Sequence, residues 1–432
     1  MANIGYKNYL YLDLTARNDW SSTLPADNNS YYYPSASLSF IPTSLFEINK
    51  NINFLKFRAN AASVGNDTDP YRLIKTYENG VLAGTLTNPS TILNSNLKPE
   101  IATSYEVGVE AQFFNKRVTL DASYYITNSK NQIVGLDVSQ ATGSASNVIN
   151  AGKIQNKGIE IGLGFTLVKS ENLEWSINAN FSQNRGVVKE LTEGISNYII
   201  AQGPNGGTVE ARVGERMGNM YGRGYLRSPV GQVVFDNTGS PILDTQIKNI
   251  GNYNPDWMLG LSTNLRFKNI ALNALFDIRH GGEIYSMTNA IGMESGILAV
   301  SLPGRETGIV GDGVVKNSDG SYSPNTTVVS AENWYYSNAF RRDNIEANSF
   351  DASYVKLREV SLNYRFSQKL IKAVNLQNLS IGLVGNNLAL WTKVPNIDPE
   401  TQSLSGGTLL PGFEVLQLPS SRSYGVKINV SF

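Results

Sequence analysis

The sequence contains no cysteine and only one histidine, His280, among its 432 residues. The lack of cysteine excludes a disulfide framework, a thiolate nucleophile and a cysteine-based zinc or iron–sulfur site. A single histidine excludes a histidine-rich metal site, and no G-x-S-x-G motif accompanies it to indicate a serine hydrolase. We therefore expect no catalytic residue, no metal ion and no cofactor, and we expect that the protein is not an enzyme.

An excess of one charge and long apolar runs are also missing. The chain has 36 basic and 36 acidic side chains, so its formal net charge is zero. This balance removes any argument from composition for a nucleic-acid partner. No stretch approaches the roughly 18 consecutive apolar residues of a membrane-spanning helix. The chain is instead rich in glycine (39) and tyrosine (22), a mixture typical of β-strands joined by many turns.

Twelve segments alternate apolar and polar side chains with the period of two that is typical of β-strands. They span residues 9–18, 31–41, 54–64, 104–114, 118–127, 158–167, 174–182, 257–267, 270–279, 354–366, 379–390 and 424–432. The alternation slips by one residue near Arg358–Glu359 and near Gly385–Asn387, where we expect β-bulges. The sequence therefore predicts an all-β protein.

The connections between these strands alternate between short and long. This alternation places the short turns at one end of the sheet and the long loops at the other, as in outer-membrane barrels. Each regular strand also keeps charged side chains off its apolar face, so that face can meet hydrocarbon while the polar face lines a wet lumen. We predict an antiparallel up-and-down transmembrane β-barrel. Within the long connection 183–256, the segments 210–225 and 231–235 are candidates for an additional hairpin.

The last predicted strand, 424–432, ends in an aromatic residue. Tyr424, Val426, Ile428, Val430 and Phe432 share one face, and Phe432 ends the chain. A terminal phenylalanine on an amphipathic strand resembles the signal that the bacterial barrel-assembly machinery recognises. We expect Tyr424, Gly425 and Phe432 to form this assembly signal.

Several longer segments are similar to one known family. These segments are LYLDLTARNDWSS (10–22), YYYPSASLSF (31–40), LKPEIATSYEVGVEAQFF (97–114), NPDWMLGLSTNLRFKNIAL (254–272) and GNNLALWTKVPNIDPE (385–400). They resemble the barrel of SusC-like (RagA-type) TonB-dependent outer-membrane transporters. The resemblance extends over nearly the whole chain, in the order in which the family has these segments.

The resemblance implies a location and a role. A complete member has an N-terminal plug domain, a TonB box and a 22-stranded barrel, so we expect residues 1–432 to be about the last twelve strands, without the plug. It implies a multi-pass barrel in the lipid bilayer of a Gram-negative outer membrane, inserted by the barrel-assembly machinery. It further implies import of oligosaccharides or peptides with a SusD-like lipoprotein, and contact with TonB through the N-terminal part. A fragment of this kind should not transport actively by itself.

Aromatic residues in the long loops are candidates for contact with a substrate or partner. Trp334, Tyr335 and Tyr336 are adjacent, Arg341 follows them, and Trp391 lies at the loop end of the penultimate strand. Such rings can stack on sugar faces, and arginine can hydrogen-bond hydroxyls. The alternative for each is ordinary packing within a loop or in an aromatic girdle at the membrane surface.

Two other functions stay open at this point. The chain could form a self-standing small outer-membrane pore or surface enzyme, or it could be a soluble all-β carbohydrate-binding module. A soluble sandwich also alternates apolar and polar residues, but it buries its apolar rows between two stacked sheets. The environment of those rows therefore distinguishes the soluble module from the membrane barrel.

Overall fold

The computed structural model describes residues 1–74, 76–87, 89–137, 143–192, 194–373, 375–405 and 408–432. One fourteen-stranded sheet dominates it. In spatial order its strands are β1 (Ala2–Tyr6), β2 (Leu10–Trp20), β3 (Ser30–Phe40), β4 (Ile52–Asn66), β8 (Glu100–Phe113), β9 (Val118–Asp137), β10 (Ser146–Lys169), β11 (Leu173–Glu190), β17 (Trp257–Phe267), β18 (Ile270–His280), β25 (Tyr354–Arg365), β26 (Asn378–Thr392) and β30 (Ser423–Ser431). The short β7 (Thr91–Ile92) pairs in parallel with β10.

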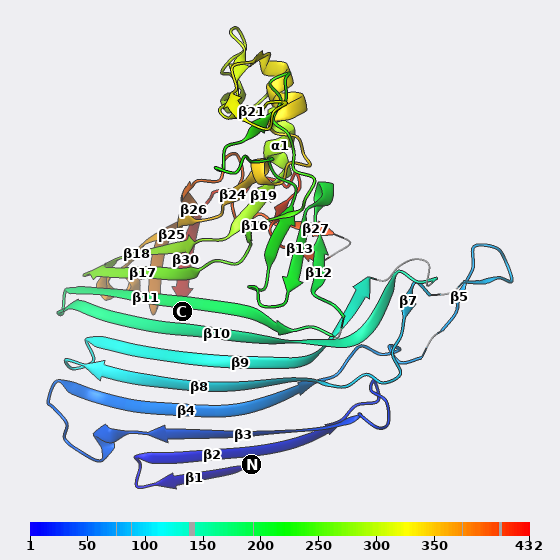
Figure 1. The fold of residues 1–432 in the computed structure, drawn as a ribbon. Helices are drawn as coiled ribbons and strands as arrows, with labels where there is room; N and C mark the ends of the chain where they lie inside the picture. The colour runs from blue at the N-terminus through cyan, green and yellow to red at the C-terminus, as the bar shows by residue number, and fades with distance from the viewer. Residues whose placement is uncertain (75, 88, 138–142, 193, 374, 406–407) are drawn as a thin grey trace.

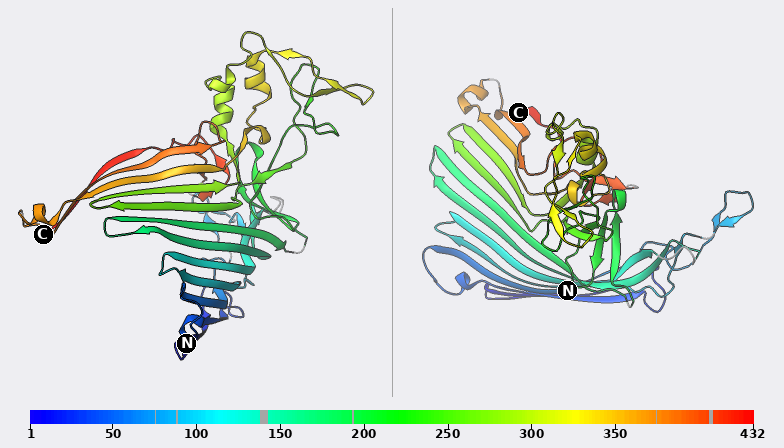
Figure 2. Two further views of the ribbon diagram at one scale, coloured as in Figure 1. Left: turned by 90° about the vertical axis from the view of Figure 1, so that its left-hand side faces the viewer. Right: turned by 45° about the horizontal axis from the view of Figure 1, so that its top comes forward.

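Neighbouring strands along this order pair antiparallel, and their spatial order follows the chain. The predicted all-β, up-and-down antiparallel fold is therefore confirmed. Figures 1 and 2 show the strands side by side in a curved sheet, with the short turns at one end and the long connections at the other. In the described part of the chain, β1 pairs only with β2 and β30 only with β26, so both edges of the sheet are open.

The two faces of the sheet differ sharply. Residues directly opposite each other on paired strands point to the same face. One row of such residues crosses the sheet without a polar side chain: Leu10, Phe40, Phe57, Val109, Ala122, Ile161, Phe181, Leu259, Ile278, Val355 and Trp391. From β4 to β25 the adjacent row, on the opposite face, contains only charged, amide and glycine residues: Lys56, Glu110, Asp121, Gly162, Asn180, Gly260, Asp277 and Lys356. On β26 this row continues with Leu390.

The apolar rows are exposed and have no second sheet stacked on them. Val107, for example, is 56% exposed, and Phe57 and Leu383 are similarly accessible. A soluble sandwich would bury these residues, so their exposure argues against the carbohydrate-binding module. The polar face is instead crossed by ion pairs. Arg58 on β4 reaches Glu106 (3.3 Å), Glu110 (3.2 Å) and Asp121 (2.7 Å).

Both expected bulges are present. The β18–β25 register shifts beside Arg358, and the β25–β26 register shifts between Leu357 and Glu359. On β26, Asn387 lies in this irregular stretch with a φ of 52°, a conformation that asparagine tolerates better than most residues. The shift lets Lys356 and Arg358 point to the polar face while Leu362, further along the strand, stays on the exposed apolar face.

The structure differs from the sequence-based strand assignment in two places. It adds β1, which folds back on β2 through a turn in which Lys7 and Asn8 both have positive φ. It also extends β9 and β10 through much of the expected loop 128–157. These extensions bury apolar side chains of their own: Val148, Ala151 and Ile154 on β10 are buried, and Val148 packs with Leu24 and Leu97 from neighbouring connections. The sequence-based assignment stopped short of them because the strict alternation of the apolar rows ends there.

The long connections fold into a compact cap, which we define as the described residues of 191–256, 281–353 and 403–422. It contains a four-stranded sheet of β12 (Asn197–Gln202), β13 (Thr208–Arg212), β14 (Asn219–Gly222) and β16 (Lys248–Asn252). Two three-stranded sheets are formed by β15 (Val234–Phe235), β21 (Val314–Lys316) and β22 (Tyr322–Pro324), and by β24 (Ser349–Asp351), β19 (Glu283–Ser286) and β29 (Phe413–Glu414). The suggested hairpin between 210–225 and 231–235 does not form, because β14 pairs with β13 and β16 while β15 pairs with β21.

Short elements complete the chain. Strand pairs are β5 (Glu78–Asn79) with β6 (Leu86–Thr87), β20 (Ile309–Val310) with β23 (Val328–Val329), and β27 (Ser403–Ser405) with β28 (Thr408–Leu410). Helical segments are η1 (Pro42–Ser44), η3 (Pro204–Gly206), α1 (Met287–Glu294), η4 (Ala299–Ser301), η5 (Asn333–Asn338), η6 (Glu346–Asn348) and α2 (Gln368–Lys372). None of the described helices has the length and apolar character needed to cross a membrane.

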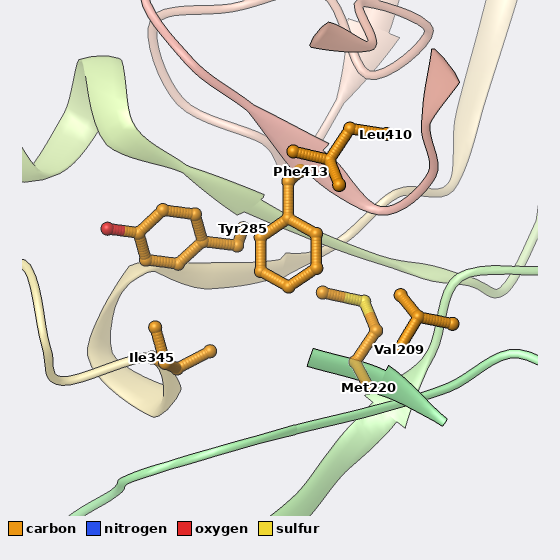
Figure 3. Close-up of a cluster of buried hydrophobic side chains, with 6 residues drawn as sticks. All are labelled: Val209, Met220, Tyr285, Ile345, Leu410 and Phe413. Carbon is orange, nitrogen blue, oxygen red and sulfur yellow. The ribbon is translucent and has the colours of Figure 1, made fainter. Parts of the chain in front are cut away.

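The cap has its own apolar core, shown in Figure 3. It consists of Val209, Met220, Tyr285, Ile345, Leu410 and Phe413, contributed by all three long connections. The Phe413 ring is fully buried, and a Cβ placed on Gly207 would lie 2.6 Å from it. This close approach requires glycine at position 207. The three connections are therefore held together as one packed unit above the open end of the curved sheet.

A charged residue on the apolar face should be costly if that face meets lipid. Leu163 on β10 pairs with Leu120 and Ala179, all on the apolar face. We predict that Leu163→Arg lowers the free energy of unfolding of the membrane-inserted protein by about 2–4 kcal/mol, because the guanidinium must enter hydrocarbon. The measurement is denaturant unfolding in lipid vesicles followed by tryptophan fluorescence.

The matched control is Asn180→Arg, which places the same side chain on the polar row between Gly162 and Gly260. We expect it to change the free energy of unfolding by much less than Leu163→Arg. Equal tolerance of arginine at both positions would mean that both faces meet water.

Candidate functional site

The polar face of the sheet binds a loop segment through buried charges. Residues 393–402, which follow β26 and which we call the strap, lie against β25 and β18. Lys356 on β25 is only 4% exposed, and its Nζ lies 2.6 Å from Oδ1 of Asp398. It also forms an ion pair with Glu400 of the strap. An uncompensated buried ammonium is very unfavourable, so these two carboxylates account for the position of Lys356 inside the fold.

A second cation shares the same carboxylate. Arg358 forms ion pairs with Glu400 and with Asp277 of β18, and the Tyr354 hydroxyl donates to Glu400 (2.8 Å) and Asp277 (3.1 Å). Burial alone would raise the pKa of Glu400. Hydrogen bonds from Arg358, Lys356 and Tyr354 outweigh that effect and lower the pKa to about 2. The strap is therefore held on the lumen wall by charges that stay ionised at neutral pH.

The strap also has an apolar attachment. Val394 is buried with Ile284 of β19 and Ala352, and Ile397 packs against this group. Asn396 donates to Asn289 of α1 at 3.2 Å. The strap thus contacts both the sheet and the cap.

Two carboxylates face each other where the cap joins the sheet. Glu283 on β19 and Asp351 on β24 are directly opposite each other in the register. Burial, reinforced by the charge of Asp351, raises the pKa of Glu283 to about 7. Burial would also raise the pKa of Asp351, but hydrogen bonds from Ser353 and Lys393 lower it overall. The pair therefore carries one charge on Asp351 while Glu283 stays easily protonated.

The cap contains a crevice of about 580 Å³ near its outer tip. Its lining comes from α1, η4, η5 and the segments next to them. The lining residues are Met293, Glu294, Ser295, Gly296, Ser301, Arg305, Ser330, Ala331, Glu332, Tyr335 and Tyr336. A volume of this size is within the range of small-molecule sites. We call it the cap crevice.

Local interactions shape the cap crevice. Ser286 caps α1 by accepting a hydrogen bond from the Asn289 backbone N–H at 3.0 Å. At the other end of α1, Glu294 is held by Arg342 at 2.7 Å. Arg305 donates to the Ser301 carbonyl (3.1 Å) and to the Gly296 carbonyl, which joins the two sides of the lining. The crevice is therefore bounded by groups whose positions are fixed by hydrogen bonds.

The four loop residues singled out in the sequence have different environments. Tyr336 is 62% exposed and lines the crevice. Tyr335 is only 8% exposed, stacks on Phe340, and its hydroxyl donates to the Val300 carbonyl at 3.3 Å. Trp334 is half-buried and stacks on Phe235 with ring centroids 6.2 Å apart. Arg341 forms an ion pair with Asp343 outside the crevice lining. Of the four, Tyr336 is therefore the best placed to contact a ligand.

Trp391 has a different location. It pairs with Val355 in the apolar row and is 56% exposed on that face, opposite to Lys356 and the strap. This placement favours the girdle interpretation over contact with a substrate in the lumen. Tyr424 and Phe432 are highly exposed on or beside the edge strand β30, and Gly425 pairs with Val384.

Sequence reasoning missed the strap and most of the crevice. The strap's two acids lie within PNIDPE (395–400), two residues apart, but only the fold brings them to Lys356. Glu294, Arg305 and Glu332 are scattered over about 40 residues with no motif in common. No group of three or more potential metal ligands occurs among the residues that the structure describes.

Comparison with known proteins gives consistent results. The family model described as "TonB dependent receptor-like, beta-barrel" matches residues 1–388. TonB-dependent receptor P3 of Formosa agariphila is 24% identical over 474 residues, covering all of this chain and 45% of that protein. TonB-dependent receptor SusC of Bacteroides thetaiotaomicron is 24% identical over 300 residues, covering 62% of this chain and 29% of that protein.

Among solved structures, the RagAB peptide transporter superimposes with a TM-score of 0.78 at 20% identity, covering all of this chain and 47% of that one. At this identity the likeness shows a shared fold. The chain thus spans slightly less than half the length of the relatives that it matches from end to end. The resemblance to SusC-like transporters noted in the sequence is confirmed.

Removal of Lys356 should release the strap. Lys356→Met would leave Asp398, itself 9% exposed, without its cation. We predict a loss of about 3–5 kcal/mol in the free energy of unfolding, because a buried charge is left uncompensated. Faster cleavage of the strap by a protease of broad specificity should accompany this loss. The control is Lys393→Met: Lys393 is 80% exposed in its ion pair with Asp351, so we expect a change within about 1 kcal/mol. Similar effects of the two variants would contradict the strap assignment.

The Glu283 carboxyl should make cap stability depend on pH. Its pKa in the folded protein (about 7) exceeds the ordinary value of 4.5, so the folded state binds the proton more tightly. Its stabilising contribution is complete below about pH 4.5 and is lost as the pH rises through about 7. We predict that Glu283→Gln, which cannot ionise, removes this part of the pH dependence in hydrogen exchange of β19. The exposed Glu306→Gln should leave the dependence unchanged, and an unchanged dependence in Glu283→Gln would refute the assignment.

Proposed function

The chain belongs to the TonB-dependent receptor β-barrel family, and from this premise we propose that it forms part of the wall and outer cap of an oligosaccharide importer in a Gram-negative outer membrane. The observation that carries the proposal is the difference between the two faces of the sheet. One face has an exposed apolar row, and the other has charged residues that bind the strap. An apolar outer band and a polar interior are what a membrane-embedded barrel requires. Nutrient import is the general role that the family supports.

We propose that the active protein is larger than this sheet. In lipid, an unpaired strand edge leaves backbone groups without hydrogen bonds, each at a cost of several kcal/mol. The open edges at β1 and β30 would pair with strands supplied by the rest of such a protein, and residues 1–432 alone would not transport. This requirement also argues against the self-standing small pore. Contact with TonB would be made by parts that lie outside the sheet described here.

The proposed partner is a SusD-like lipoprotein at the cell surface. The receptor SusC and the RagAB transporter resemble this chain, which supports a comparable pairing here. The cap, built from three of the long connections, is the surface that such a lipoprotein would meet. We further propose Tyr424, Gly425 and Phe432 as the signal for the barrel-assembly machinery, since β30 presents them on a fully exposed strand.

Oligosaccharide is favoured over peptide as the cargo because the cap combines an exposed tyrosine with carboxylates and hydroxyls in one crevice. Peptide remains the second candidate, since the RagAB relatives are described as peptide importers and have the same fold. An enzymatic role has no support in the site, where no nucleophile is paired with a histidine. The proposed protein binds and imports, and it needs no cofactor of its own.

A growth experiment in the natural host tests the proposal. We predict that deletion of the gene abolishes growth on one class of neutral oligosaccharide as sole carbon source, and that the complete gene restores it. Growth should also be lost when TonB is removed, because import depends on its energy. Host growth on defined peptides is the parallel arm. Loss of growth on peptides alone would favour the second candidate, and unchanged growth on both would contradict the importer role.

A further inference from the structure

We propose that the cap crevice is a surface binding site for a neutral sugar unit of an oligosaccharide, with Tyr336 and Glu332 as its principal contacts. The inference rests on the proposed import of oligosaccharides and adds a site to it. The crevice is lined by residues of α1, η4, η5 and the segments next to them, and none of these lining residues belongs to the strap or to the fourteen-stranded sheet. Figure 1 shows α1 in the part of the cap that lies far from that sheet. It is therefore placed to meet a glycan before the glycan reaches the lumen.

The charges of the crevice favour a neutral ligand. Its two carboxylates, Glu294 and Glu332, are balanced by Arg305 in the lining and by Arg342, which holds Glu294 at 2.7 Å. An anionic ligand would meet Glu332, which has no ion pair among those found in the described residues. A cationic ligand would gain little, because the two carboxylates are balanced by two guanidinium groups once Arg342, which lies outside the lining, is counted with Arg305.

The hydrogen-bonding groups of the crevice match hydroxyls. A carboxylate only accepts hydrogen bonds, and serine hydroxyls both donate and accept. Glu332, Ser295 and Ser330 together can therefore satisfy sugar hydroxyls, which are donors and acceptors on adjacent carbons. Arg305 donates through Nε and Nη2 to the Ser301 and Gly296 carbonyls, so these donors shape the lining.

The aromatic groups supply the apolar contact. Tyr335 is buried, and its ring packs on Phe340, which fixes the backbone of η5. The next residue, Tyr336, presents 62% of its surface to solvent at the rim of the crevice. A large exposed ring beside carboxylates suits the face of a sugar ring, whose C–H groups stack while its hydroxyls bind at the edge. A crevice of about 580 Å³ accommodates one or two sugar units.

Binding to intact outer membranes tests this site. Outer membranes are prepared from cells that produce the complete natural protein, and fluorescent neutral oligosaccharides of glucose, mannose, xylose and galactose are titrated in the absence of an energy source. A uronic-acid oligosaccharide and a lysine-rich peptide serve as charged probes. We expect binding of at least one neutral probe, with Tyr336→Ala and Glu332→Gln each weakening it about tenfold. The natural protein should bind the charged probes no more tightly than the two variants bind the neutral probe.

Matched controls lie in the same cap outside the crevice. Tyr322→Ala removes a partly exposed tyrosine of β22, and Glu306→Gln neutralises an exposed glutamate. Both should bind the neutral probe as the natural protein does. Tyr336 and Glu332 are exposed, so their variants should reach the surface in normal amounts, which an antibody against the cap verifies.

The possible results separate the site from the proposed function. Unchanged binding in both crevice variants, preference for the peptide or the uronic acid, or no binding of any neutral probe would overturn the sugar site. Energy-dependent growth on an oligosaccharide can persist in that case and would leave the importer role intact. Loss of probe binding in the crevice variants, in cells that show no TonB-dependent growth, would support the site and contradict the importer role.

Discussion

The structure depends on one constraint: each long strand must present apolar side chains on one face of the sheet and polar side chains on the other. Directly paired residues point to the same face, so a strand in register with its neighbour extends an apolar row on one side and a polar row on the other. The row from Leu10 to Trp391 and the row from Lys56 to Lys356 are adjacent in register but lie on opposite faces. A slip of one residue in a strand would move the polar side chains of its other face into the apolar row, and this penalty fixes the register across the sheet.

The position of the strap depends on the polar face of the sheet. Because the polar face is lined by unlike charges rather than by a packed core, a loop can bind it through ion pairs, as Asp398 and Glu400 do with Lys356 and Arg358. The bulge at Arg358 is what brings both cations to that face. The cap, in contrast, is held by ordinary apolar packing around Phe413. The molecule thus combines an electrostatic interior wall with a hydrophobic outer cap, and the strap touches both.

The environments of the candidate residues show where sequence reasoning stops. Three adjacent aromatic residues, Trp334, Tyr335 and Tyr336, are equivalent in the sequence, yet one stacks on Phe235, one is buried and one is exposed. Their orientation follows from the π-helical backbone of η5 and from partners that include Phe235 and Val300, which lie more than 30 residues away. Neither has a local signal in the sequence. Trp391, by comparison, was correctly located at the loop end of its strand, but its face followed only from the register with Val355.

By itself, the sequence determined the strand content, the up-and-down order, the two bulges and the division into an apolar and a polar face. All of these follow from side-chain alternation within ten or so residues, which is local information. Tertiary structure alone decided the extra strand β1, the lengthening of β9 and β10, the pairing of β15 with β21, the strap and the cap crevice. These arise from backbone pairing and from contacts between charges far apart in the chain, and such contacts leave no periodic trace in the residues that make them.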